Sequence, residues 1–413
     1  MMNYRWKNSA VLTTMVAFSI AFAPLALAEK PAQPIARLPT LVDFLGATNL
    51  PGLGGIAVAG RYGMVGLLKL EGDTLKLHRL ENPPKEDFNA VTRLSDSEAL
   101  VGSSIGNIYL YDGSTLTKLV KLSEYQEPVL AMTALDGKAW AVGGRGMIAK
   151  SPDGKTWEEL EISGVIQPPI AWPAGHQGDW YFGAMNIDPD SVKFTANVGG
   201  KPAVPDEDYE LFANEGFLQN TSDLDMDPVP TIEFKFSPGP PFRPTDVTWN
   251  VVMNDGKTVT IAGEFGMVLQ SVDDGETWTR RDPTIVDHEP DMAYWLDGVQ
   301  AGDNIFLAGA AGVNSVSRDG GITWSVQPRP ANEGIFGITL LDSGEPLIAG
   351  AVGLIGKFDG SEWALGDRTR LKLLSWLKNP VSLDDGSVLM LGGRSTAVSF
   401  KDGAWTRVPV DAD

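Results

Sequence analysis

Alternating carboxylates are the residues of this chain whose type and spacing best suit metal chemistry. Asp223, Asp225 and Asp227 stand at every second position of one loop. Carboxylate oxygens are the ligands that Ca²⁺ prefers. The EF-hand pattern is not met, because Pro228 stands where that pattern needs glycine and Phe234 where it needs its last glutamate. We therefore expect a solvated acidic loop and no cofactor, with Ca²⁺ as a weak candidate.

The other residue types that could do chemistry point to no catalytic site. His78, His176 and His288 are isolated in the sequence, and there is no cysteine, so a structural zinc site is not expected. Carboxylates at residues 206–210 could pair as acid and base. The chain has 53 acidic residues, however, so adjacency alone is no evidence for a site. We expect a protein without catalytic residues and without enzyme activity.

A glycine turn that recurs at a regular spacing must organise the rest of the chain. The turn begins at Gly60, Gly102, Gly143, Gly263, Gly309, Gly350 and Gly392, and a weaker copy ends at Gly183. A period of about 41 residues with four short apolar runs per unit is typical of a β-propeller blade. The sequence predicts an all-β propeller of seven or eight four-stranded blades, and seven if the weak copy is no complete blade.

A second turn pattern follows each glycine turn and supports the same fold. Its short polar side chains can bond to their own backbone while a glycine takes the bend, and a tryptophan anchors the next strand. We expect these residues to be structural. They are Ser151, Asp153 and Trp157; Ser271, Asp273, Gly275 and Trp278; and Ser317, Asp319, Gly321 and Trp324.

The doubled spacing between Gly183 and Gly263 divides the chain. A stretch rich in proline and acidic residues, 184–245, lacks the blade turns and is predicted to be an insertion. Residues 46–183 and 246–413 are then the two parts of the propeller. A lead-in with three prolines, residues 29–45, is predicted to be an extended strap.

The second turn pattern resembles the Asp-box, or bacterial neuraminidase (BNR) repeat. Coupled to a preceding glycine turn at this spacing, it is similar to the photosystem II stability and assembly factor family of propellers, over most of residues 50–410. The resemblance implies a non-enzymatic scaffold that binds membrane-protein intermediates, in the thylakoid lumen of a photosynthetic organism. In a bacterium without photosynthesis it implies a periplasmic partner of an envelope membrane complex.

A carbohydrate-active propeller, either a sialidase-like hydrolase or a lectin, is the alternative. The stretch Phe242-Arg243-Pro244-Thr245 faintly resembles the sialidase motif that bears the first substrate-binding arginine. It departs at its third and fourth positions and lies in the middle of the chain. Convergent arginines with a Tyr/Glu pair in one pocket would favour the hydrolase, and an aromatic surface without them would favour the scaffold.

Aromatic residues and arginines are predicted to gather at the end of the propeller that carries the glycine turns. The aromatics stand near the start of each first strand, and the arginines stand within the turns themselves. Both residue types often dominate the binding energy of protein interfaces. The candidates for a binding face are Arg61, Phe88, Arg145, Trp249, Trp295, Phe336, Trp376 and Arg394. The alternative is that the aromatics pack between neighbouring blades.

The first 28 residues have the pattern of a secretory signal peptide. Two cations precede an apolar run, and Ala26-Leu-Ala28 forms a cleavage site before Glu29. We expect a monomer that is periplasmic or secreted and does not insert in the membrane after cleavage. The formal net charge of −20 argues against a nucleic-acid partner, which would require a basic patch.

Overall fold

The computed structural model describes residues 40–174, 176, 178–237, 247–283 and 293–412. Pro39 to Asp413 form one compact unit. The signal peptide, most of the lead-in and the Phe242–Thr245 stretch lie outside the described residues. In the part of the chain that is described, the only helical elements are 3₁₀ turns, so the fold is all-β. No helix among these residues has the length and hydropathy to cross a membrane.

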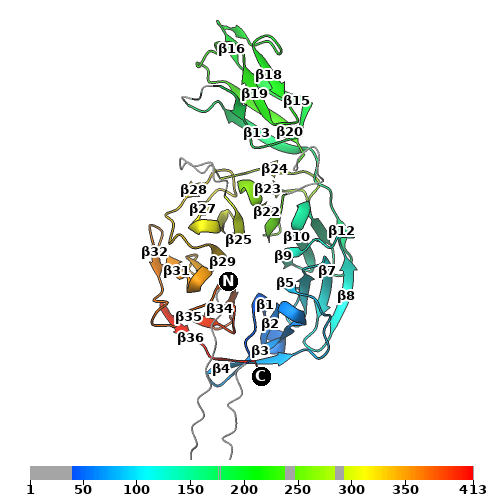
Figure 1. Ribbon diagram of the computed structural model, residues 1–413, viewed down its shortest axis with the longest axis vertical. Helices are drawn as coiled ribbons and strands as arrows, with labels where there is room; N and C mark the ends of the chain where they lie inside the picture. The colour runs from blue at the N-terminus through cyan, green and yellow to red at the C-terminus, as the bar shows by residue number, and fades with distance from the viewer. Residues whose placement is uncertain (1–39, 175, 177, 238–246, 284–292, 413) are drawn as a thin grey trace, which may run out of the picture. The chain divides into compact units, whose positions relative to one another are not determined.

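Seven meanders of four strands, which we call the sheets, make up most of the structure (Figure 1). Five of them are separate four-stranded sheets, whereas the first and the fourth are extended at their outer edge by further strands. The first three sheets are β1 (Phe44–Leu50), β2 (Gly55–Gly60), β3 (Val65–Glu71) and β4 (Thr74–Arg79); β5 (Phe88–Arg93), β6 (Ala99–Ser103), β7 (Asn107–Tyr111) and β8 (Leu116–Lys121); and β9 (Val129–Leu135), β10 (Lys138–Gly143), β11 (Ile148–Ser151) and β12 (Glu158–Glu159).

The other four sheets follow a long excursion of the chain. They are β21 (Trp249–Asn254), β22 (Val259–Gly263), β23 (Val268–Ser271) and β24 (Thr279–Arg280); β25 (Trp295–Ala301), β26 (Asn304–Gly309), β27 (Asn314–Ser317) and β28 (Ser325–Val326); β29 (Ile335–Leu340), β30 (Pro346–Gly350), β31 (Ile355–Phe358) and β32 (Trp363–Leu365); and β33 (Leu377–Ser382), β34 (Val388–Gly392), β35 (Ala397–Lys401) and β36 (Ala404–Arg407).

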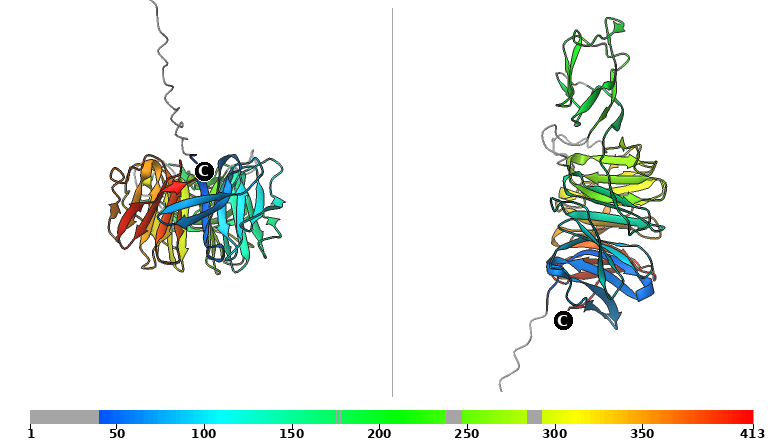
Figure 2. Two further views of the ribbon diagram at one scale, coloured as in Figure 1. Left: turned by 90° about the horizontal axis from the view of Figure 1, so that it is seen from below. Right: turned by 90° about the vertical axis from the view of Figure 1, so that its right-hand side faces the viewer.

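The sheets stand side by side and bury their faces on one another (Figure 2). The second strand of each sheet is almost wholly buried and reads as a continuous run of apolar and small residues, such as GIAVAG in β2 and NIFLAG in β26. Such runs are expected where both faces of a strand are covered. Seven hydrophobic clusters fill the spaces between consecutive sheets.

The last sheet also contacts the first. One hydrophobic cluster contains Phe44 and Leu391. The Asn379 amide donates a hydrogen bond of 2.7 Å to the carbonyl oxygen of Phe44. The C-terminal strand β37 (Val410–Asp411) pairs in parallel with β4, at the outer edge of the first sheet. First strands are therefore neighbours in a cycle that runs from β1 through β33 and back to β1.

Along the chain, a lobe of further strands lies between the third and fourth sheets, which contact each other directly through β9 and β21 (Figure 1). It contains β13 (Val165–Ala171), β14 (Trp180–Tyr181), β15 (Ile187–Thr195), β16 (Asn197–Val198), β17 (Lys201–Pro202), β18 (Tyr209–Phe212), β19 (Phe217–Asn220) and β20 (Thr231–Phe236). The strand order β15-β20-β13-β24 joins the lobe to the fourth sheet, and Phe236 and Trp278 belong to one hydrophobic cluster.

Two of these lobe strands precede the predicted start of the insertion at residue 184. β13 pairs with β20, and β14, which contains the weak eighth copy of the repeat, pairs with β19. Trp180 packs against Trp172 and Phe182 inside the lobe, with ring centroids 5.1 Å apart in each pair. This aromatic packing places residues 165–183 with the insertion.

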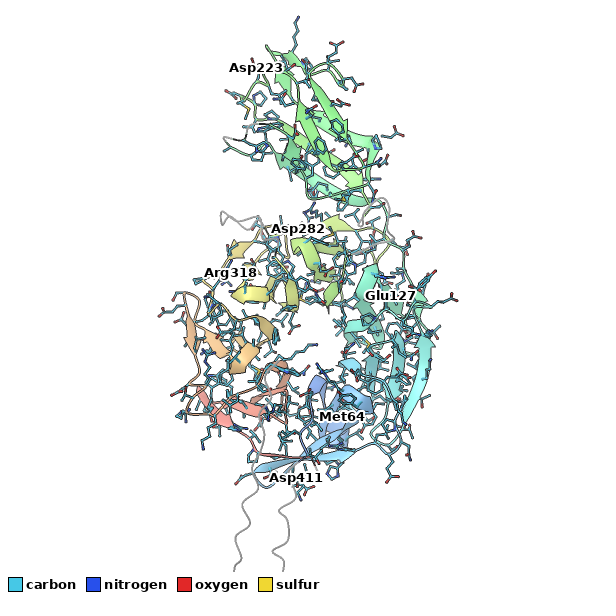
Figure 3. The ribbon with its side chains drawn as sticks, viewed as in Figure 1. Met64, Glu127, Asp223, Asp282, Arg318 and Asp411 are labelled. Carbon is cyan, nitrogen blue, oxygen red and sulfur yellow. The ribbon has the colours of Figure 1, made fainter. Side chains whose placement is uncertain are left out.

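The acidic loop of the lobe carries the three candidate cation ligands. Asp223 lies in the lobe (Figure 3). The Asp225 carboxylate accepts hydrogen bonds from the backbone N–H groups of Gly199 and Gly200, at 3.2 and 2.8 Å. Within the described ranges no three acidic or histidine side chains are arranged to hold a metal ion. Asp225 therefore connects two loops of the lobe.

The predicted structural turns between third and fourth strands form the same hydrogen-bond pattern. At 271–278 the Asp273 carboxylate accepts bonds from the backbone and hydroxyl of Thr277, and the Ser271 hydroxyl accepts one from Gly275 N–H. The turn at 317–324 repeats these bonds through Ser317, Asp319 and Thr323, and the turn at 151–157 repeats the aspartate part. These residues hold backbone and do no chemistry.

Acid should loosen these turns. Bonds from Thr277 and Thr323 lower the pKa of Asp273 and Asp319 to about 2, from an ordinary value of 3.8. A carboxylate whose pKa is lowered by folding stabilises the protein above its unfolded pKa, and this contribution is lost as pH falls from about 4 to 2. Between about pH 4 and 2, we expect the thermal unfolding midpoint of the double variant Asp273→Asn/Asp319→Asn to fall less steeply than that of the unsubstituted protein. An unchanged slope would contradict this role.

Two of the turn tryptophans, Trp278 and Trp324, should differ in their contribution to stability. Trp278 is buried against Trp140, whereas Trp324 is half-buried. Both indole N–H groups donate to a glycine of their own turn at 3.1 Å, so burial is the main difference between them. We expect Trp278→Ala to lower the free energy of unfolding by about 3–5 kcal/mol, and Trp324→Ala by less. Urea denaturation measures both, and the reverse order would contradict the packing argument.

Candidate functional site

The glycine turns form one continuous surface at one end of the sheets. We call it the turn face: the turns 61–63, 104–106, 144–146, 264–266, 310–312, 351–353 and 393–395, with the connectors that precede the first strands. Six of the seven turns donate a backbone hydrogen bond to the residue before their own first strand, as Gly144 N–H does to Pro128 and Glu264 N–H does to Thr248. The structural turns that contain Asp273 and Asp319 lie at the opposite ends of their sheets.

In six of the seven sheets the glycine that precedes the turn is required by a close approach of backbone, and Ser103 stands at this position in the second sheet. A Cβ on Gly60 or Gly143 would lie 1.9 Å from the carbonyl oxygen of Asp43 or Pro128, and one on Gly263 would lie 2.0 Å from that of Thr248. No side chain fits at such a distance. Glycine therefore recurs at this position because the connector crosses the turn so closely.

In three of the sheets the last glycine of the turn donates a hydrogen bond to the connector of the next sheet. The N–H groups of Gly63 and Gly146 donate to the carbonyl oxygens of Glu86 and Val247, both at 2.7 Å. These glycines have φ of 77° and 72°, which lies in the left-handed region. The two glycines thus fix both the turn and its attachment to the neighbouring connector.

The middle residue of the turn is left-handed as well, and it points outward. Tyr62, Phe265 and Val352 have φ of 57°, 59° and 52°, and their exposed fractions are 90%, 54% and 58%. A positive φ is a clear outlier for a β-branched or bulky residue, and asparagine or glycine would be less strained there. Strained residues of this kind cluster at functional sites. These large apolar side chains are therefore candidates for binding.

The aromatics predicted at the first strands are buried in the core. Phe88, Trp249 and Trp295 pair with the last residue of the neighbouring second strand, and each ring lies in a hydrophobic cluster between sheets. The Trp295 indole also donates to the Gly266 carbonyl at 3.1 Å. The same position is occupied by a buried residue in every other sheet, namely Phe44, Val129, Ile335 and Leu377.

Two of the predicted aromatics are displaced from this position. A bulge between Ile335 and Gly337 puts Ile335 opposite Gly350, so Phe336 is half-buried and faces the centre of the sheets. Trp376 precedes β33, and its carbonyl oxygen accepts a bond from Gly393. The fixed sequence offset thus combined three structural positions, because the hairpin loops 341–345 and 383–387 are one residue longer than the loop 255–258 of the fourth sheet.

The three predicted arginines lie on the turn face and are exposed. Arg145 forms an ion pair with Glu127, with 3.3 Å between guanidinium and carboxylate. Arg61 lies 3.8 Å from the Asp43 carboxylate, and the backbone N–H of Arg394 donates to that same carboxylate. Asp43 therefore connects the first and last sheets on this face.

Exposed aromatic rings gather on the turn face, although they are other rings than the predicted ones. Among the described residues the exposed aromatics are Tyr62, Tyr125, Phe265, Tyr294 and, in the lobe, Tyr181. Leu374 and Val352 add exposed aliphatic side chains in the same turns and connectors. The sequence signal for the strained side chains is their place in the middle of each glycine turn, as Tyr62 stands in Gly60-Arg61-Tyr62-Gly63.

Two cavities open on the turn face, at different seams between sheets. One of about 740 Å³ lies between the third and fourth sheets, and its lining includes Arg145, Glu127 and Val247. The other, of about 540 Å³, lies where the first and last sheets meet and is lined by Arg61, Arg394 and their neighbours. Both volumes are in the range of ligand sites.

A smaller cavity of about 230 Å³ lies among the first strands. Asn89 and Asn250 each donate a side-chain hydrogen bond to the carbonyl oxygen that begins the next first strand, at 3.3 and 3.0 Å. Burial raises the pKa of Asp297 to about 6, although it accepts a 2.8 Å bond from Ile338 N–H. Burial lowers the pKa of Lys378. These polar groups connect adjacent sheets at their centre.

A Tyr/Glu pair is present, but it keeps the tyrosine protonated, whereas an activated tyrosine nucleophile must lose its proton. The Tyr109 hydroxyl donates to the Glu86 carboxylate at 2.6 Å. Burial, together with this bond, raises the pKa of Tyr109, so the phenol is held protonated. Tyr109 also packs edge-on against the buried Phe88. The pair is a core hydrogen bond and lends no support to a sialidase-like mechanism.

Comparisons with known proteins relate the chain to propellers by structure. No family model matches the chain, and no curated protein sequence does. A structure described as YCF48 bound to D1 peptide matches at TM-score 0.55 with 12% identity, over 88% of this chain and 93% of that one. YCF48 from Cyanidioschyzon merolae matches at 0.55 with 13% identity, over 88% and 96%. The WD40 β-propeller domain of Doa1 matches at 0.51 with 11% identity, over 87% and 93%.

These similarities show the fold and do not show a family. The chain is an all-β protein of many small sheets with a β-propeller-like fold. The similarity to YCF48 therefore supports the expected resemblance to photosystem II assembly factors only at the level of the fold.

Replacing the strained turn residues should stabilise the protein. We expect Val352→Asn and Phe265→Asn each to raise the free energy of unfolding by about 1 kcal/mol, because asparagine tolerates the left-handed conformation. The matched control is Val326→Asn, at an exposed valine in a regular strand, which should give no gain. Chemical denaturation decides between them. A loss of stability in both turn variants would show that these side chains are kept for packing.

Proposed function

We propose that this chain is a non-enzymatic β-propeller that binds another protein through its turn face. The observation that carries the proposal is the set of large apolar side chains at Tyr62, Phe265 and Val352, which are exposed although their backbone conformation disfavours them. A turn with no function beyond connecting strands would be more stable with asparagine or glycine there. Apolar side chains that cost stability and face solvent are expected where a partner covers them.

The propeller that we propose has seven blades in a closed ring. Support comes from the seven four-stranded meanders and the cycle of contacts among their first strands. The hydrogen bond from Asn379 to Phe44 and the pairing of β37 with β4 both join the last sheet to the first. In this proposal the lobe strands form no eighth blade, since they pair with one another and with the edge strand β24.

The proposed partner is a membrane-protein complex, reached by an extended segment or a soluble loop. One similar structure is that of YCF48 bound to D1 peptide, so peptide binding occurs in a protein of this fold. The signal-peptide pattern of residues 1–28 supports a periplasmic or secreted location, with a thylakoid lumen in a photosynthetic organism. We propose that the chain works there as a monomer.

Site-specific photocrosslinking tests the face. A benzophenone amino acid is placed at Tyr62 or Phe265 on the turn face, or at the controls Val272 or Ile322. The controls are exposed apolar residues in the structural turns at the opposite ends of the sheets. Irradiation of intact cells should give a discrete adduct from the two turn-face positions and none from the controls. Mass spectrometry of the adduct then identifies the partner.

The outcomes separate the alternatives. Adducts from Val272 or Ile322 alone would place binding at the opposite end and contradict the proposal. Adducts from none of the four positions would exclude both ends of the sheets as contact surfaces. Val352→Asn should reduce the yield at Phe265 while raising the unfolding midpoint, because the exposed side chain serves binding at the expense of stability.

A further inference from the structure

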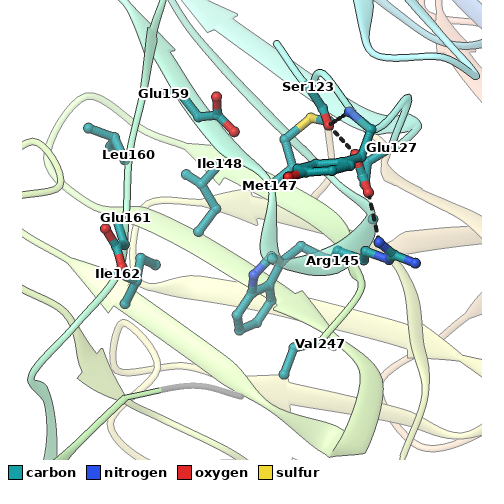
Figure 4. A pocket seen from close by; sticks show the side chains of 14 residues that line it. Ser123, Glu127, Arg145, Met147, Ile148, Glu159, Leu160, Glu161, Ile162 and Val247 are labelled. Carbon is teal, nitrogen blue, oxygen red and sulfur yellow. Dashed lines mark hydrogen bonds and ion pairs between the residues drawn. The ribbon is translucent and has the colours of Figure 1, made fainter. Parts of the chain in front are cut away.

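We propose that the cavity between the third and fourth sheets binds an apolar side chain of a partner segment that carries lysine or arginine beside it. This inference rests on the proposed function and names the chemistry of the segment that the turn face takes. The cavity of about 740 Å³ opens beside the turn 144–146 and the strand β12 (Figure 4). It lies where the chain leaves the sheets for the lobe, at Leu160 to Ile162, and where it returns, at Val247.

The floor of the cavity is apolar. Met147, Ile148 and Val247 are buried residues that line it, and Leu160 and Ile162 are half-buried at its side. Figure 4 shows Ile148, Leu160 and Ile162 on one side and Val247 on the other. An apolar side chain placed there would remove this surface from water, which favours binding in proportion to the area covered. Apolar lining with a few placed polar groups is the usual composition of a ligand site.

The charged groups around this floor are mostly carboxylates. Glu127, Glu159 and Glu161 line the cavity, and Arg145 is the one cation among its lining residues. The Arg145 guanidinium is paired with Glu127 at 3.3 Å, so its charge is already balanced within the cavity. Ser123 donates a hydrogen bond to Glu127 and holds it in place. Two carboxylates therefore remain in excess.

The carboxylates also repel one another. Partial burial and the negative charge of Glu127 raise the pKa of Glu159. A cationic group between them would relieve this repulsion, whereas an anionic group would increase it. The ring of Tyr125, exposed over 84% of its surface, lines the same cavity and offers a face to a lysine or arginine. The net charge of −20 would steer a basic segment towards the protein at low salt.

The arrangement changes the role expected of Arg145. From the sequence, its guanidinium was a candidate for direct contact with the partner. In the structure it joins the turn to the connector through Glu127, and the cavity beside it selects for positive charge. The other cavity of the turn face has the opposite composition, with Arg61, Arg79 and Arg394 against Asp43. The two seams therefore suit different parts of a partner.

Defined peptides test the chemistry directly. The first probe is a fluorescein-labelled peptide with a central phenylalanine between two lysines on each side. The second has glutamates in place of the lysines, and the third has glycine in place of the phenylalanine. Fluorescence anisotropy with the full chain should show binding of the first peptide, weakened by salt, with a Kd below about 1 mM. The other two should bind at least about fivefold more weakly.

Substitutions of the cavity carboxylates test whether the peptide binds at this cavity. We expect Glu159→Gln with Glu161→Gln to weaken the lysine peptide by about fivefold to tenfold and to reduce its salt dependence. The matched control is Glu158→Gln, on the same short strand but outside the lining, which should change Kd by less than about twofold. None of these variants should lower the unfolding midpoint, since the side chains lie at the surface and the substitutions remove mutually repelling charges.

Three results would overturn the inference. They are equal binding of the glutamate peptide, absence of binding of the lysine peptide up to about 1 mM, and equal weakening by Glu158→Gln and the double variant. The proposed function is tested separately by the crosslinks at Tyr62 and Phe265. If those crosslinks form while the peptide fails, the cavity assignment is wrong and the binding face stands.

Discussion

A backbone contact that leaves no room for a Cβ sets the geometry of this protein. In six of the seven sheets the carbonyl oxygen before the first strand crosses the glycine that precedes the turn, at a distance that a side chain would occupy, and Ser103 takes this position in the second sheet. Because the connector is held this closely, the last glycine of the turn in three of the sheets reaches the connector of the next sheet, as Gly146 reaches Val247. One local contact thereby determines both the turn and the spacing of neighbouring sheets.

The same constraint decides which side chains meet solvent. In six of the seven turns the middle residue lies in the left-handed region and is exposed, and Ile105 of the second sheet is the exception. The fold therefore presents one variable side chain from each of six sheets on a common face, at a cost in backbone strain when the residue is bulky. Tyr62, Phe265 and Val352 carry that cost, whereas Ala311 at the equivalent position exposes little apolar surface.

Charge differs from seam to seam along this face. Between the third and fourth sheets Arg145 is balanced by Glu127, and further carboxylates surround an apolar floor. Where the last sheet meets the first, arginines outnumber the one carboxylate, Asp43, which also bonds to the turn of the last sheet. A propeller-like arrangement allows such differences because each seam is lined by separate connectors, while the buried second strands stay nearly alike.

The sequence by itself determined the all-β class, the repeat and the structural role of the Ser271 and Ser317 turns, since turn chemistry and period are local properties. It also located the end of the sheets where the glycine turns lie. Only the tertiary structure decided which aromatics are exposed. Phe88, Trp249 and Trp295 are covered by the neighbouring sheet, whereas Phe336 lies one residue past the equivalent position because the loop after its strand is one residue longer, which a fixed offset along the chain did not reveal. The pairing of Arg145 with Glu127, and of residues 165–183 with the lobe, likewise depends on contacts between segments distant in sequence, and such contacts are set by packing.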